Sequence, residues 1–206
     1  MTSADVDNII NVTFVDDTAW RNAISGVTIN GTPINLADVN ISAGSISFNP
    51  ANISALQTPG NKTIVVNATG YSAATVVQTI GVGMLSISGS TFSVNPALAE
   101  GQTSAATIRT NDQYGNAIAN QNLKYDIVID VDDTDPTTDE AYTIHNRSVN
   151  GDITIIGIDT TSNTQGDIQF NITLPATVDV GDGVSVLVRR YSDLANIGSP
   201  ITYSKQ

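Results

Sequence analysis

Apolar and polar side chains alternate over short stretches along most of this chain, which is the pattern of β-strands with one buried face. Ala106 and Ile108 alternate with polar residues just before a turn at residues 112–116, Asp-Gln-Tyr-Gly-Asn. After the turn, one face of the second strand is apolar and the other is mainly acidic: Leu123, Tyr125, Ile127, Ile129 and Val131 against Lys124, Asp126, Asp130 and Asp132. Glycine, aspartate and asparagine favour turns because they tolerate or stabilise tight backbone conformations. The pattern predicts that the two strands form an antiparallel pair inside a β-sandwich.

The first part of the chain, residues 1–83, shows the same alternation together with two predicted short helices. Asp16 or Asp17 can cap a helix that runs to about Ile24, because a carboxylate there accepts bonds from free backbone N–H groups. Asn49-Pro50 has the composition of a second helix start, an N-cap residue followed by proline at the first helical position. We therefore expect a mainly β domain with two helical turns.

Two domains are predicted, with Gly81-Val82-Gly83 as the hinge between residues 1–83 and residues 84–206. Asn30-Gly31, between two alternating stretches, predicts a tight hairpin in the first domain. In the second domain, short strands alternate with Gly, Asn and Pro, which is typical of an Ig-like sandwich. The expected fold class is all-β: two Ig-like β-sandwich domains in tandem, the first with two short helices.

Charge and composition narrow the function classes. The net charge is −12, and most acidic residues lie in the second domain. An acidic surface repels nucleic acid and anionic membranes, so we expect no nucleic-acid partner. No apolar run approaches the ~20 residues that span a bilayer, so no membrane insertion is expected. The chain has no cysteine, and a disulfide-free sandwich favours a bacterial source.

An acidic segment in the second domain is the main candidate for a metal site. Its carboxylates are Asp130, Asp132, Asp133, Asp135, Asp139 and Glu140. Calcium takes about six to eight oxygen ligands, so a curled loop over Asp132–Glu140 could supply them. The alternative is a solvated acidic loop that aids solubility. Asp179 and Asp182 flank a glycine-containing turn and form a second candidate site.

Catalysis is not expected from this composition. His145 is the only histidine, and with no cysteine it has no partner for a zinc site or a Cys–His pair. Aromatic residues make up 5% of the chain, which is few for a sugar-cleaving cleft. Trp20 is interpreted as a core residue. Arg189 and Arg190 are interpreted as part of a solvated strand face, with an outward interface contact by Arg190 as the alternative.

Two resemblances to known families add to this interpretation. The turn at residues 112–116 and the run Gly166–Ile172 resemble Ig-like modules of bacterial surface-layer (S-layer) proteins and invasin-type adhesins. Residues 9–80 resemble the haemoglobin-interacting modules of bacterial haem-acquisition receptors. The matching segments are Trp20 to Ile24, Val27 to Gly31, Gly60 to Ile64 and Ala68 to Tyr71.

These resemblances imply a protein that is secreted to the bacterial cell surface or cell wall. The first expectation is a structural role in an S-layer lattice, with other copies or neighbouring domains of the same protein as partners and Ca²⁺ as a stabilising ion. The alternative is a surface receptor or adhesin module that binds haemoglobin or another host protein. Direct haem ligation is disfavoured, because His145 lies outside the module that resembles the haemoglobin-interacting family.

Overall fold

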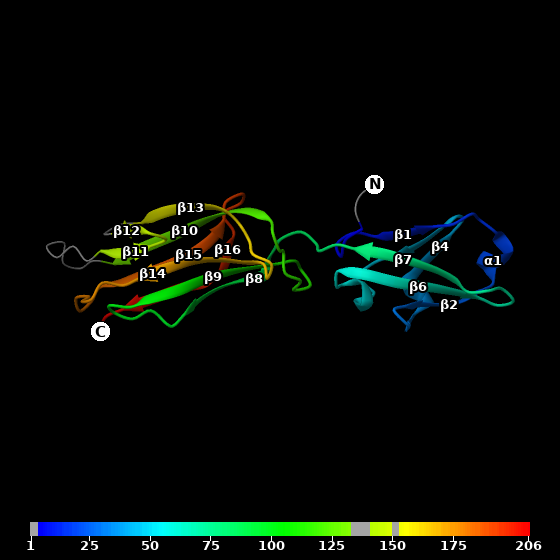
Figure 1. Cartoon of the computed structure of the whole chain (residues 1–206), viewed down its shortest axis with the longest axis horizontal. Coiled ribbons are helices and arrows are strands. Elements are labelled where there is room, and N and C mark those ends of the chain that lie inside the picture. The colour runs from blue at the N-terminus through cyan, green and yellow to red at the C-terminus, as the bar shows by residue number, and fades with distance from the viewer. Residues whose placement is uncertain (1–3, 133–140, 150–152) are drawn as a thin grey trace. The chain divides into compact units, whose positions relative to one another are not determined.

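The computed structural model describes residues 4–132, 141–149 and 153–206. Its described part consists mainly of antiparallel β-strands, with one α-helix and two turns of 3₁₀ helix. The chain divides into two compact units, Met1–Met84 and Leu85–Gln206, named unit 1 and unit 2 below (Figure 1). The predicted all-β fold class is confirmed.

Unit 1 consists of two antiparallel sheets that face each other. The first has the order β1-β5-β4, with β1 (Ile10–Thr13), β5 (Ser45–Phe48) and β4 (Val39–Ser42). The second has the order β3-β2-β6-β7, with β3 (Thr32–Ile34), β2 (Ile24–Ile29), β6 (Gly60–Ala68) and β7 (Ala74–Ile80). Ile46 and Phe48 from the first sheet and Ile29 and Ile64 from the second are fully buried, so the core lies between the sheets.

The helical turns of unit 1 differ in part from the sequence prediction. Helix α1 (Thr18–Asn22) is capped by Asp17, but it ends before Ile24, which pairs with Ala68 in the sheet instead. The other helical turns are η1 (Leu36–Asp38) and η2 (Ser54–Leu56). Asn49 accepts a hydrogen bond from the Ala51 N–H and caps a turn, so the predicted helix start at Asn49-Pro50 is wrong. Strand pairing and local turn bonds outweigh the weak helix preference here.

The Asn30-Gly31 hairpin is confirmed between β2 and β3. Asn30 and Gly31 have φ angles of 49° and 81°, the left-handed values that a tight two-residue hairpin requires. The Asn30 Oδ1 accepts a hydrogen bond of 2.8 Å from the Thr63 N–H on the neighbouring strand β6. The turn residue therefore also ties the hairpin to the centre of its sheet.

Unit 2 is a larger sandwich of two antiparallel sheets. One has the order β13-β10-β15-β16, with β13 (Thr154–Thr161), β10 (Asn122–Asp132), β15 (Gly183–Arg190) and β16 (Asn196–Ser204). The other has the order β12-β11-β14-β9-β8, with β12 (Arg147–Val149), β11 (Tyr142–Ile144), β14 (Asp167–Thr173), β9 (Thr103–Asn111) and β8 (Ser86–Asn95).

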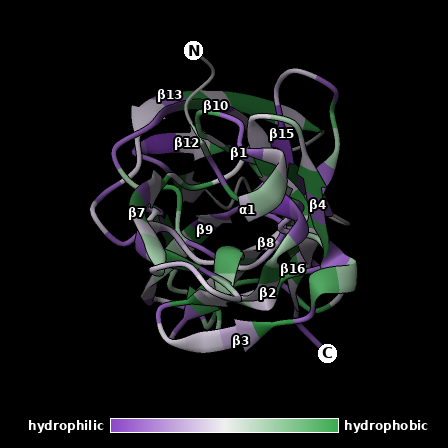
Figure 2. Cartoon of the chain, turned by 90° about the vertical axis from the view of Figure 1, so that its right-hand side faces the viewer, coloured by the Kyte–Doolittle hydropathy of each residue, from purple (hydrophilic) through white to green (hydrophobic). Residues whose placement is uncertain are grey.

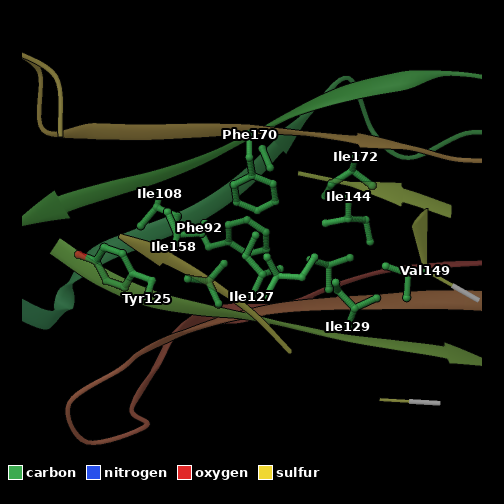
Figure 3. Close-up of a cluster of buried hydrophobic side chains, with 14 of the residues drawn as sticks. Phe92, Ile108, Tyr125, Ile127, Ile129, Ile144, Val149, Ile158, Phe170 and Ile172 are labelled. Atoms are coloured by element: carbon green, nitrogen blue, oxygen red, sulfur yellow. The ribbon is translucent and has the colours of Figure 1, made fainter. Parts of the chain in front are cut away.

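A single apolar cluster fills the space between the sheets of unit 2 (Figure 3). Phe92 on β8 and Phe170 on β14 stack with their ring centroids 6.1 Å apart. Ile127 and Ile129 on β10 reach the cluster from the opposite sheet. Figure 2 shows both apolar and polar residues along the strands. The burial of the apolar ones shows that they face the core, as the alternation of side chains along a strand allows.

The strands on either side of the turn at residues 112–116 do not pair with each other, so the predicted antiparallel pair is wrong. Strand β9 pairs with β8 and β14, whereas β10 pairs with β13 and β15 in the other sheet. After the turn, the Ile118 N–H donates back to the Thr110 carbonyl, and the chain then crosses to the opposite sheet. Both strands still place their apolar residues in one core, which is why the alternation alone did not reveal the crossing.

Candidate functional site

The predicted calcium site lies mainly outside the described residues. Asp133, Asp135, Asp139 and Glu140 all belong to the segment 133–140. The two members that are described, Asp130 and Asp132, are exposed near the end of β10. They lie two residues apart on the outer face of the sheet, opposite Ser185 and Gly183 of β15. Within the described part of the chain, no three His, Cys, Asp or Glu side chains come together as a metal site would require.

The two residues of the second candidate metal site, Asp179 and Asp182, differ in their exposure to solvent. Asp179 is exposed, whereas Asp182 is almost fully buried. The backbone of this turn is bonded to the C-terminal strand, because the Gly181 N–H donates to the Lys205 carbonyl and the Lys205 N–H donates to the Asp182 carbonyl. The Lys205 ammonium pairs with Glu100, and the charge of Asp179 acts on it more weakly.

The other carboxylates of unit 2 on described strands are mostly committed to ion pairs. Asp126 on β10 pairs with Arg189 on β15 at 3.1 Å, and Asp159 on β13 pairs with Lys124 on β10 at 3.0 Å. Arg189 therefore belongs to a strand face, as predicted. The Arg190 Nε donates to Asp193 Oδ1 at 2.9 Å, so this guanidinium is held within its own turn.

The turn at residues 112–116 is closed by a buried carboxylate. Asp112 is completely buried, and its Oδ1 accepts hydrogen bonds of 2.9 Å from the backbone N–H groups of Tyr114 and Asn116. The Asn116 side-chain amide donates to the same carboxylate at 2.8 and 3.1 Å. Gly89 of β8 lies so close to the Asp112 carbonyl that an added Cβ would be 2.3 Å from it. Asp112 and Asn116 therefore have a structural role: they hold the turn at residues 112–116 closed.

Unit 1 contains a concave surface lined mainly by apolar and aromatic side chains. It consists of two adjoining hollows of about 210 and 280 Å³, which share Phe14, Trp20 and Ala74 and are here called the Trp20 groove. The first hollow also contains Val12, Thr13, Ile46, Val66, Thr75 and Val76; the second also contains Val15, Asp17 and Tyr71. The groove lies between β1 and β7, which are edge strands of the two sheets. It is open because these two edges do not pair along this length.

The aromatic side chains of the groove are held in place by local contacts. Phe14 and Trp20 meet edge to face, with ring centroids 5.1 Å apart. Asp17 caps helix α1 by accepting from the Trp20 N–H at 3.1 Å, which orients the helix that carries the tryptophan. The Thr69 N–H donates to the Ala23 carbonyl at 2.8 Å, so the loop with Tyr71 is attached to the end of that helix.

Two of the groove residues are strongly exposed although they are apolar or aromatic. Val15 is 97% exposed and Tyr71 is 45% exposed. Beside them, Asp16 pairs with Arg21, and the hydrogen bond from this guanidinium holds the pKa of the Asp16 carboxyl below its ordinary value. The groove therefore combines uncovered apolar surface with a rim on which Asp16 is paired with Arg21 and Asp17 caps helix α1, an arrangement suited to contact with another protein.

A larger but more polar concavity, of about 560 Å³, lies on the outer face of sheet β1-β5-β4. Its side chains include Asn11, Asn40, Asn49 and Asn52. Such a surface can offer neutral hydrogen bonds, but it lacks an aromatic platform. His145 occupies the first position of the β11–β12 turn, with a φ of 48°, and its ring packs against Phe170 at 6.2 Å. That placement agrees with a structural role for the single histidine.

Sequence reasoning placed Trp20 in the core and did not single out Phe14, Val15 or Tyr71. Trp20 is in fact half-buried at the surface of the groove. The alternation Val12–Phe14 could have indicated an apolar residue beyond the end of β1, and Val15 directly after it breaks the polar pattern. The approach of Tyr71, more than fifty positions away, depends on the tertiary fold.

Residues 1–81 match a haemoglobin-interacting family. The family is described as "Heme-binding protein Shr-like, Hb-interacting domain", and its match covers nearly all of unit 1. The predicted resemblance of the first domain is therefore confirmed at the level of the family. No curated protein matches the chain. In the described part, no helix is long and apolar enough to cross a membrane.

Several solved structures align with the chain at low similarity. The adhesin InvE of Yersinia pseudotuberculosis is 16% identical with a TM-score of 0.38, and the alignment covers 98% of this chain and 55% of that one. Invasin, a bacterial integrin-binding protein, is 16% identical with a TM-score of 0.34, covering 98% and 37%. The serine-rich repeat protein Srr2 of Streptococcus agalactiae is 11% identical with a TM-score of 0.29, covering 98% and 82%. These TM-scores are too low to support a conclusion about this chain.

Proposed function

We propose that this chain is a non-enzymatic module of a bacterial cell-surface receptor or adhesin, and that unit 1 binds haemoglobin through the Trp20 groove. The observation that carries the proposal is the match of residues 1–81 to a haemoglobin-interacting family. The groove supports it physically, because binding energy at protein interfaces concentrates in a few aromatic side chains that become desolvated.

The arrangement of the groove favours a preformed contact. Phe14 and Trp20 already pack together, and Tyr71 is attached through its loop to helix α1. Little side-chain entropy is then lost when a partner docks, and this smaller loss makes the affinity higher. A partner that inserts an apolar side chain between β1 and β7 would contact Ala74, Phe14 and Trp20.

Unit 2 serves in this proposal as an Ig-like spacer that carries no site of its own for haemoglobin. The more specific expectation, a surface-layer lattice stabilised by Ca²⁺, stays a prediction from sequence resemblance. Most of its carboxylates lie in residues 133–140, and the described carboxylates Asp130 and Asp132 are only two of the oxygen donors that calcium needs. The receptor interpretation is therefore the one we develop.

The test is direct binding of human haemoglobin to the purified chain, measured by biolayer interferometry with serum albumin as the unrelated protein. Tyr71→Ala and Val15→Asp should each weaken binding at least tenfold, because each removes exposed apolar contact at the groove. Val77→Asp is the matched control, since Val77 is a 60% exposed valine on β7 that does not line the groove. It should change the affinity less than twofold.

Two outcomes contradict the proposal in different ways. Absence of binding by the unmodified chain would remove haemoglobin as the partner of unit 1. Equal weakening by Val15→Asp and Val77→Asp would keep haemoglobin as the partner and remove the Trp20 groove as the contact surface. Because all three substituted positions are exposed, thermal unfolding of the variants should match that of the unmodified chain.

A further inference from the structure

A row of apolar side chains crosses the outer face of unit 2, where the sheet is otherwise polar. Val128 on β10 lies directly opposite Ile155 on β13 and Leu187 on β15. The neighbouring positions on this face include Asp126 paired with Arg189, and exposed Asp130 opposite Ser185. Ile155 is 50% exposed, and Ile153, just before β13, is 65% exposed. The row thus ends in two uncovered isoleucines.

Among the residues that the structure describes, β13 is paired on one side only, with β10, so the row ends at an edge of that sheet (Figure 1). Natural proteins protect edge strands with charges, proline, bulges or very short length. On the opposite edge, β16 contains Pro200 and a register shift against β15. In the other sheet, β8 has a register irregularity and β12 has three residues, one of them Arg147.

Strand β13 has none of these protections over its first half. Residues 153–157 read Ile-Thr-Ile-Ile-Gly, with no charge and no proline, in a chain whose net charge is −12. The first charge on the strand is Asp159, and Lys124 already pairs with it. An uncharged edge with β-branched side chains is the kind of strand that adds to a strand of another molecule.

The segment is complementary to itself in one register. If two copies pair antiparallel about a two-fold axis at Ile155, each Ile155 faces its own symmetry mate. Ile153 of one copy then lies across from Gly157 of the other, where an added Cβ would have no neighbour within 4 Å, so there is room for the isoleucine. The apolar row would continue from Leu187, Val128 and Ile155 of one copy into the same three residues of the second.

We propose that β13 is a self-association edge, through which two copies of this chain join their β13-β10-β15-β16 sheets into one continuous sheet centred on Ile155. The pairing covers the exposed isoleucines and adds backbone hydrogen bonds between the two copies of β13. It is independent of the haemoglobin proposal, because it concerns unit 2 alone.

Cysteine cross-linking tests the register. The chain has no cysteine, so an introduced cysteine is the only thiol that can react. Ile155→Cys should form a covalent dimer with a short bismaleimide, because directly opposite Cβ atoms lie about 4.5–5.5 Å apart. Ile153→Cys is the matched control on the same edge. In the proposed register the two cysteines would lie about 13 Å apart, four residues along the strand, and should cross-link far less.

Sedimentation equilibrium tests the association itself. The average mass of the unmodified chain should rise toward twice the monomer mass with concentration. The rise should be stronger at high salt, since added ions screen the repulsion between two chains of charge −12. Ile155→Lys should weaken the dimer at least tenfold, whereas Thr202→Lys, an exposed position on the same face of β16, should not.

A chain that stays monomeric at every concentration and salt level overturns the proposal. Equal cross-linking of Ile155→Cys and Ile153→Cys also overturns it, because the two-fold register distinguishes them. Both cysteine positions are half or more exposed, so each variant should keep the far-ultraviolet circular dichroism of the unmodified chain. Loss of that spectrum in Ile155→Lys leaves the register test by the cysteine variants to decide.

Discussion

The two units are both antiparallel sandwiches, yet they leave different apolar residues uncovered. Unit 1 leaves aromatic side chains, Phe14 and Trp20, in a gap between two sheet edges. Unit 2 leaves aliphatic side chains, Ile153 and Ile155, along one edge strand. The difference arises from the cores: in unit 1 the edges β1 and β7 separate, whereas a continuous cluster fills unit 2.

This contrast indicates two kinds of contact. A hollow lined by rings accepts an inserted side chain from a partner of different shape, and rings contribute much binding energy for their size. An uncharged strand edge accepts another strand, and the match is made mainly by backbone hydrogen bonds. Three predictions test the contrast between the units, beginning with the largest expected effect.

Because each unit has its own core, a core substitution should lower the stability of the unit that carries it and leave the other unit unchanged. Ile127→Ala should destabilise unit 2 by about 3–4 kcal/mol, because it leaves a cavity in a fully packed cluster. Ile64→Ala should do the same to unit 1, where Ile64 is 1% exposed. Amide hydrogen exchange by mass spectrometry should locate each loss of protection in the substituted unit. Equal loss in both units from either substitution would mean that the chain unfolds as one cooperative body.

The turn at residues 112–116 should contribute more to the free energy of unfolding than the Asn30-Gly31 hairpin. Asp112→Ala should cost about 3 kcal/mol in urea unfolding, because it removes a buried acceptor and leaves the backbone N–H groups of Tyr114 and Asn116 without it. Asn30→Ala at the exposed hairpin should cost about 1 kcal/mol, since it loses one bond and favours φ > 0 less well. Similar costs for both would contradict the view that burial makes the unit 2 turn the stronger one.

The smallest effect is expected at Tyr125, at one end of the unit 2 cluster in Figure 3. Its hydroxyl is buried and has no hydrogen-bond partner among the described residues. Tyr125→Phe should therefore stabilise unit 2 by about 1 kcal/mol at neutral pH. Urea unfolding of the two proteins at pH 7 measures this difference. A loss of stability at pH 7 would mean that the hydroxyl has a favourable partner.

The same substitution also has a pH signature. Burial raises the pKa of Tyr125 from 10.0 to about 12, so the folded protein keeps this proton where the unfolded chain releases it. The associated stability is complete below pH 10 and is lost as the pH rises through about 12. Tyr125→Phe removes that loss, so its advantage should grow over this pH range. An advantage that does not depend on pH would contradict the raised pKa.

The predicted fold was accurate where local pattern decides structure. Alternation located most strands, and Asn30-Gly31 identified its hairpin, because a left-handed two-residue turn has few compatible sequences. The pairing of β9 with β10 was wrong, because alternation reports which face is buried and carries no information about which strand is the neighbour. The predicted end of helix α1 was also too late in the chain, because Ile24 pairs with Ala68 in the sheet.

The candidate sites also differ in how far the sequence could predict them. The predicted metal ligands rested on carboxylate density, and that prediction stays untested, because Asp133, Asp135, Asp139 and Glu140 lie outside the described residues. Among the described residues, no three His, Cys, Asp or Glu side chains gather as a metal site requires. The Trp20 groove joins Phe14 to Tyr71 and Ala74, which are distant in sequence. Neither the openness of that groove nor the place of β13 at the end of the described strand order can be derived from spacing, because both depend on which strands pair.

The sequence by itself determined the all-β class, the inward face of most strands and the acidic character of unit 2, because these follow from residue period and charge. Only the tertiary structure decided that β1 and β7 separate around Trp20 and that β13 lies at an edge with Ile155 outward. Strand order is set by the packing of the whole core, to which residues far apart in the chain contribute together.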